Sequence, residues 1–238
     1  METAPLLRRP LQFRQVAGDY LVVASLPKNS VTLATKAQEA GADAVLLNID
    51  GDDSARPNHL GSYDLHDAYI KDVISTLSIP CGIFIGGAKQ VTPEYWERVM
   101  SSDFGFVEMF AHQMPLFVLS DTRVGKLVGV ASGYILEQVK QLSQLEGVVG
   151  LDSATVSPQF RGSPFSAFDY ATLAVISGLS AKPVLLRTQK KMARRDLEMV
   201  LKLGVKGVVV DPAALSGADE AYREELASLC PRRNQTGQ

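Results

Sequence analysis

The chain of 238 residues has little cysteine, almost no charge excess and no long apolar segment, and each shortage excludes a class of protein. Its two cysteines, Cys81 and Cys230, lie far apart without metal-site spacing, which is typical of a reducing compartment. A formal net charge of −2 gives no general attraction to nucleic acid or to an anionic membrane surface. No segment approaches the roughly 20 apolar residues of a membrane span, and the start has no apolar region of signal length. The sequence therefore predicts a cytoplasmic protein whose partners include neither nucleic acid nor membrane.

The sequence also lacks a linker rich in Pro, Ser or Gly and any low-complexity segment, and one pattern repeats along it instead. A short run rich in Val, Ile and Leu is followed by a polar turn and an amphipathic stretch, which is typical of βα repetition. The runs that predict strands lie at 20–25, 44–49, 81–86, 104–109, 126–131, 148–153, 183–188 and 207–212. The stretches that predict helices lie at 31–42, 66–78, 92–102, 134–147, 166–180 and 193–204.

Eight such units predict an α/β fold, a single-domain (β/α)8 TIM barrel over residues 1–238. Residues 1–18 are expected to form an N-terminal tail or capping segment, and 231–238 a flexible C-terminal tail. A doubly wound open sheet is the alternative, but eight similar units of about 25 to 30 residues fill the length typical of the barrel. Two loops, 50–64 and 154–165, are longer than the rest, and because both follow strands we expect both at the functional mouth.

Acidic residues stand near the C-terminal ends of alternate predicted strands. Successive strand residues face opposite sides, and the purely β-branched set should face the helices. This choice places acids and one amide on the inward side of strands two, four, six and eight: Asn48, Asp50, Glu108, Asp152 and Asp211. Alternate strands contribute to the same layer of a barrel interior, so we expect the carboxylates to converge.

Converging carboxylates require compensation, because neighbouring negative charges and burial both disfavour ionisation. The options are a divalent cation such as Mg²⁺ or Mn²⁺, shared protons for acid/base chemistry, or basic side chains reaching in. The basic candidates are Lys28, Lys89, Arg187 and Lys190. The candidate metal ligands are Asp50, Glu108 and His112, and the histidines at 59, 66 and 112 would allow a softer transition metal.

Several of these candidate site residues also have a purely structural interpretation. Asp211 precedes Pro212 and is a candidate helix N-cap, and Asp50 is a candidate member of a solvated turn around Gly51. A single histidine such as His59 is more often a loop residue than a ligand. The basic residues after strand seven are explained in large part as solvated charges on a helix.

The segment "LEMVLKLGVKGVVVDPAALSG" resembles the last two units of phosphate-binding barrels such as thiamine phosphate synthase and N-acetylmannosamine-6-phosphate epimerase. Those families bind phosphate through glycine-rich turns after strands seven and eight. Here strand seven ends in "LLRTQKK" without glycine, and Asp211 stands at the small residue's position. The segment "NIDGDDSARP" is similar to the strand-two region of dihydropteroate synthase and related pterin-binding barrels, where acids and an Asn hold the pterin.

Together these features predict a cytosolic barrel enzyme acting on a small polar or anionic metabolite by carboxylate acid/base chemistry, as a lyase, isomerase or epimerase. Glu108 and Asp152 are the candidate catalytic residues, and a divalent cation is an optional assistant. The candidate substrate-binding residues are Lys28, Asn48, Arg187, Lys190 and Asp211. The alternatives are a transferase barrel of the pterin-binding type, and a ligand-sensing or scaffold barrel without catalysis. A helix face of the barrel would allow a homo-oligomer.

Overall fold

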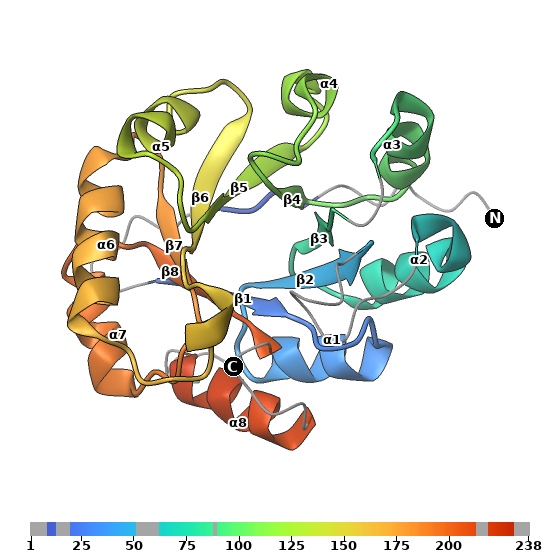
Figure 1. Cartoon of the computed structure of the whole chain (residues 1–238). Helices are drawn as coiled ribbons and strands as arrows, with labels where there is room; N and C mark the ends of the chain where they lie inside the picture. The colour runs from blue at the N-terminus through green and yellow to red at the C-terminus, as the bar shows by residue number, and fades with distance from the viewer. Residues whose placement is uncertain (1–8, 13–19, 51–61, 88–89, 213–218, 231–238) are drawn as a thin grey trace.

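The computed structural model describes residues 9–12, 20–50, 62–87, 90–212 and 219–230. Eight parallel strands close into a barrel in chain order, with β8 hydrogen-bonded to β1 (Figure 1). The strands are β1 (Leu21–Ser25), β2 (Ala44–Ile49), β3 (Cys81–Ile85), β4 (Phe106–Phe110), β5 (Gly125–Ala131), β6 (Val148–Ala154), β7 (Val184–Arg187) and β8 (Gly207–Val210). All eight predicted strands are confirmed to within about two residues at each end, a normal uncertainty for element boundaries.

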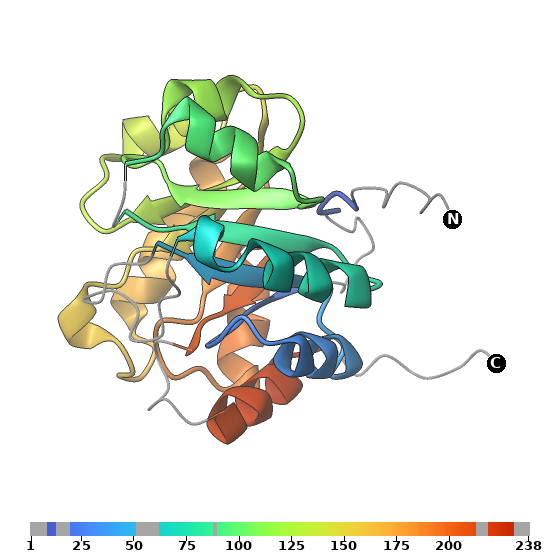
Figure 2. The ribbon, with the colours of Figure 1, turned by 90° about the vertical axis from the view of Figure 1, so that its right-hand side faces the viewer.

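Helices follow the strands on the outside of the barrel. They are α1 (Val31–Glu39), α2 (Asp67–Thr76), α3 (Pro93–Met100), α4 (Leu116–Ser120), α5 (Leu136–Leu142), α6 (Ala167–Leu179), α7 (Arg194–Leu201) and α8 (Asp219–Leu229), with short 3-10 turns η1 (Tyr63–Leu65) and η2 (Pro158–Phe160). Figure 2 shows α1, α2 and α3 stacked along one flank of the barrel. Of these helices, α4 and α8 were not predicted from the sequence. None of the helices in the described part of the chain is long and apolar enough to cross a membrane.

The helix ends follow the signals in the sequence. The hydroxyl of Thr92 accepts a hydrogen bond from the backbone N–H of Tyr95 and caps α3, with Pro93 in its first turn. Ser166 and Asp169 form a reciprocal capping box at the start of α6. Two glycines close behind helices have the left-handed backbone expected of helix-ending residues: Gly41 and Gly204. Gly147 also has a positive φ, but α5 ends at Leu142, so this glycine lies in the turn before β6.

The interior of the barrel is a separate apolar layer. Its buried side chains alternate along the strands with those that face the helices: Leu21, Val23, Ala44, Leu46, Phe84, Phe106, Leu127, Leu185 and Val209. Leu11 joins them from the described part of the N-terminal segment. Gly82 makes room for the ring of Phe106, which a Cβ at that position would overlap. The predicted choice of inward face is therefore confirmed for the body of the barrel, and it brings the strand ends together above this layer.

Candidate functional site

A cluster of charged side chains lies above the apolar layer, centred on Arg187 at the end of β7. The guanidinium binds three carboxylates from three other strand ends. Its Nε lies 2.5 Å from Asp152 Oδ2, its Nη1 lies 2.8 Å from Asp211 Oδ2, and its Nη2 donates to Glu108 Oε1. Three of the four predicted acids therefore converge, and the side chain that compensates them is one of the predicted basic candidates.

The cluster is shielded from water. Glu108 and Asp152 are 0% exposed, and Arg187 and Asp211 are 2% exposed. Burial by itself lowers the pKa of Arg187, but the charges of Asp152, Glu108 and Asp211 together raise that pKa above its usual value. The guanidinium is therefore a permanent cation of the barrel interior.

The cluster gathers negative charge in a small volume. Three carboxylates bind one guanidinium, and all three are buried. Asp152 Oδ1 is buried and has no hydrogen-bond partner among the residues that the structure describes. Neighbouring buried carboxylates disfavour one another's ionisation, so this arrangement suits a group that exchanges protons.

The two polar residues of strand two take different directions. Asn48 stays on the inward side, where its amide nitrogen donates to the carbonyl of Leu26 at 2.9 Å and to Ser25 Oγ at 3.4 Å. Asp50 does not continue the alternation of inward and outward side chains along the strand, because its φ of +49° turns the chain at the strand end. Its carboxylate accepts a hydrogen bond from the hydroxyl of Tyr95 on α3. The expectation that Asp50 joins the other acids is therefore wrong.

Lys190 and the β6–α6 loop form one side of the mouth. The Lys190 ammonium lies 2.7 Å from Asp169 Oδ2 on α6 and 5.8 Å from the centre of the Phe160 ring. Gln189 ties the long loop to strand seven, because its side-chain oxygen accepts from Val156 N at 3.0 Å. Lys28 is exposed at the end of β1, at the same end of the barrel. Lys89, His59 and most of the loop 50–64 lie outside the described residues.

An aromatic row leads from the interior to the rim of the mouth. The Phe84 and Phe110 rings meet edge to face at 5.8 Å, and the His112 ring stacks on Phe110 at 5.8 Å. Tyr134 lies beyond His112, with its hydroxyl 2.6 Å from His112 Nδ1 and accepting from the His112 backbone N–H at 3.1 Å. The Tyr134 hydroxyl therefore fixes the position of the His112 ring, which is exposed at the rim.

The predicted metal site is not assembled. Asp50 binds Tyr95, Glu108 binds Arg187 and His112 binds Tyr134, so each proposed ligand has a separate partner. No group of three acids, histidines or cysteines with metal-site geometry occurs within the described ranges.

A second layer of titratable groups lies behind Asp211, on α8. Tyr222 Oη and Glu225 Oε2 are buried, and neither atom has a hydrogen-bond partner in the described ranges. Burial and the negative charge of Asp211 raise the pKa of Glu225 to about 7. Glu225, Tyr95 and Tyr134 were not predicted from the sequence, because each partner lies far away in the chain. The sequence does contain a signal for the helix that carries Glu225, because the buried residues of α8 recur at helical spacing: Tyr222, Leu226 and Leu229.

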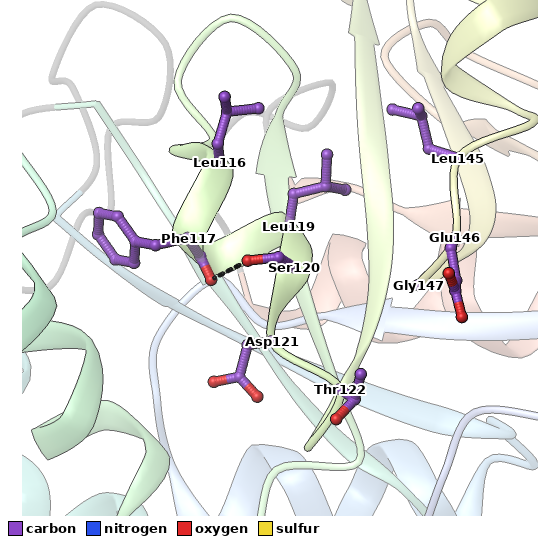
Figure 3. A pocket seen from close by; sticks show the side chains of 9 residues that line it. All are labelled: Leu116, Phe117, Leu119, Ser120, Asp121, Thr122, Leu145, Glu146 and Gly147. Carbon is purple, nitrogen blue, oxygen red and sulfur yellow. Dashed lines mark hydrogen bonds between the residues drawn. The ribbon is translucent and has the colours of Figure 1, made fainter.

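A pocket on the flank of the barrel is separate from the mouth. It has a volume of about 520 Å³ and lies between α4 and the turn that precedes β6 (Figure 3). Leu116, Leu119 and Leu145 line it together with Asp121 and Glu146. Asp121 is already held by Arg123 at 2.6 Å and by the Trp96 indole N–H at 2.7 Å. This acid therefore has a structural role in joining α3 to the turn before β5.

The comparisons place the fold among known barrels. No protein-family model matches the chain, and no curated protein matches it. Among solved structures, the tryptophan synthase α-subunit of Pyrococcus furiosus is similar with a TM-score of 0.63 and 16% identity, covering 88% of this chain and 97% of that one. Thiamine phosphate pyrophosphorylase of the same organism is similar with a TM-score of 0.56 and 16% identity, covering 87% and 96%.

These similarities show the fold, a TIM barrel. They agree with the resemblance of the C-terminal units to barrels of the thiamine phosphate synthase type, which the sequence indicated. At this level of identity a shared fold does not imply a shared reaction, which depends on the residues of the site itself.

Proposed function

We propose that the chain is a cytoplasmic barrel enzyme that binds a small polar or anionic metabolite at the C-terminal mouth and moves a proton on it. Lyase, isomerase or epimerase reactions of this kind need a carboxyl group that gives and takes protons at carbon or oxygen. The observation that carries the proposal is the convergence of three buried carboxylates on the guanidinium of Arg187.

This convergence supports acid/base chemistry because neighbouring carboxylates favour a proton shared between them. In this proposal Glu108 and Asp152 exchange that proton with the ligand, while Arg187 and Asp211 hold them in place. Asp152 Oδ1, which is buried and has no hydrogen-bond partner among the described residues, is the atom that would accept this proton. Burial strengthens each of these interactions.

The mouth supplies groups for recognition of a ligand. Lys28 and Lys190 would attract an anionic group of the ligand, and Asn48 would help to orient the ligand from the base of the site. His112, held by Tyr134, offers a ring nitrogen at the rim. We leave a divalent cation out of the proposal, because the three predicted ligands are held by separate partners.

The test is a proton-exchange screen over several classes of small metabolite. The protein is incubated in D₂O with a panel of 2-oxo acids, hydroxy acids and sugar phosphates, and loss of carbon-bound protons is followed by NMR. We expect exchange with at least one compound, lost in Glu108→Gln and retained in Asp67→Asn, an acid on the exposed side of α2 with 49% of its side chain exposed. Exchange that survives in both Glu108→Gln and Asp152→Asn would contradict the assigned roles.

A second candidate is a ligand-sensing barrel without catalysis, favoured by the closure of the acid cluster around Arg187. In that case compounds of the same panel would raise the melting temperature without any proton exchange. A pterin-type transferase is not supported by the geometry, because Asn48 binds Leu26 and Ser25 and Asp50 binds Tyr95.

A further inference from the structure

The outward face of α6 is apolar, unlike the outward faces of its neighbours. It exposes Phe168 (80% exposed), Val175 (41% exposed), Ala171 and Gly178, and the charged residue of this helix, Asp169, lies in its first turn. Its neighbour α7, by contrast, exposes charged side chains along its length: Arg194, Arg195 and Glu198. Exposed apolar side chains gathered on one helix face mark a candidate contact surface for another molecule.

A groove runs between α6 and α5, which lie side by side in Figure 1. Its volume is about 540 Å³, and Leu136, Val175 and Gly178 form much of its apolar lining. Two charged residues, Glu137 and Lys140, line it on the α5 side. The groove thus combines apolar surface with one charge of each sign.

The surfaces of α5 and α6 are self-complementary in shape and in charge, so that each could pack against a second copy of itself. On α6, Val175 projects outward, and three residues later Gly178 leaves open space, since a Cβ there would meet nothing within 4 Å. On α5, the acid Glu137 and the base Lys140 are also three residues apart. Both are exposed, and neither forms an ion pair within the described part of the chain.

A two-fold axis crossing α5 and α6 at right angles would set each helix against its own copy, running antiparallel. Val175 of each chain would then fill the space over Gly178 of the other, and Glu137 of each chain would meet Lys140 of the other. Such reciprocity is the requirement of an isologous dimer. A partner of different sequence would have no reason to match both pairs at once.

We propose that the α5–α6 face binds a second copy of this chain in a two-fold symmetric dimer. The interface core is Val175, Gly178 and Leu136, and the two reciprocal pairs of Glu137 and Lys140 fix the register. Its apolar centre with few charges resembles the composition of homodimer interfaces. This interface is independent of the chemistry at the barrel mouth.

The first test is the mass of the full chain in solution, measured by sedimentation velocity over a range of concentrations. We expect a concentration-dependent dimer that Val175→Glu converts to monomer. Met199→Glu, at a residue of α7 with 44% exposure, is the matched control and should remain dimeric. Circular dichroism shows whether each variant is folded. A monomer at all concentrations, or a dimer that a folded Val175→Glu variant retains, would overturn the proposal.

The second test reverses the charges and avoids the apolar core. Glu137→Lys and Lys140→Glu each place like charges opposite one another twice, so each should weaken the dimer by about tenfold or more. The double variant restores opposite charges in both pairs and should recover most of the wild-type affinity. Single and double variants that weaken the dimer equally, or not at all, would refute this register of the two copies.

Discussion

At the scale of single residues, the barrel centre depends on one cation that holds three anions. Arg187 binds Glu108, Asp152 and Asp211, and all four side chains are almost fully buried. Removal of the cation and removal of one anion should therefore have unequal effects. The first leaves three buried carboxylates without their shared guanidinium, whereas the second relieves the crowding of negative charge.

Replacing Arg187 by Met should destabilise the protein by about 3–5 kcal/mol or prevent folding, because it leaves buried carboxylates without their partner. Glu108→Gln keeps the shape of the side chain and removes one of the crowded negative charges, so its cost should be less than about half of that. Urea denaturation of the two variants measures both values. Equal losses of stability would mean that the crowding of the carboxylates has no effect on stability.

Glu225 should make the stability depend on pH. Its pKa is raised from 4.5 to about 7 in the folded protein, so the folded state binds more protons than the unfolded state between these values. Stability should therefore fall as pH rises from about 4.5 to about 7, by on the order of 2 kcal/mol once partial exposure is allowed for.

Glu225→Gln should remove this part of the pH dependence, as measured by urea denaturation at a series of pH values. Glu224→Gln, at the exposed neighbouring acid of the same helix, is the control. A wild-type slope that persists unchanged in Glu225→Gln would assign the effect to another group.

Residue contacts were the part of the site that sequence could predict least. Strand alternation placed Glu108, Asp152 and Asp211 on the inward side, and the structure confirms this. It failed at Asp50, because a positive φ at the strand end turned the side chain toward Tyr95. A left-handed residue at the end of a strand leaves no periodic signal in a sequence.

At the scale of elements, strands were predicted better than helices because each is a short apolar run between clear turn signals. The helix α4 has only five residues, LFVLS, which is too short to show helical periodicity. The helix α8 has a regular spacing of buried residues, so its position could have been predicted. The caps at Thr92 and Ser166 are residue types that favour helix N-termini.

The fit between β3 and β4 offers a test of packing at this scale. Gly82→Ala would push a methyl group into the ring of Phe106 and should cost about 1–3 kcal/mol through overpacking. Adding Phe106→Leu should return part of that cost, because the smaller side chain frees the space. Thermal unfolding of the two single variants and the double variant measures this coupling. Strictly additive effects would show that the two residues do not share the space.

At the scale of the whole molecule, the repeated βα pattern was enough to predict a closed barrel, since eight similar units without a linker have few other arrangements. Solved barrels with 16% identity share this fold, so the topology tolerates wide changes of sequence. The chemistry does not follow from the topology, and it rests here on the four charged residues at the barrel centre.

The central claim is that Glu108 and Asp152 of this cluster exchange a proton with a ligand at the barrel mouth. The most direct measurement is hydrogen–deuterium exchange of the ligand in D₂O, followed by NMR for the wild type, Glu108→Gln and Asp152→Asn side by side. We expect exchange of a carbon-bound proton in at least one compound for the wild type, and loss of that exchange in both variants. Exchange that persists in both folded variants would contradict the claim.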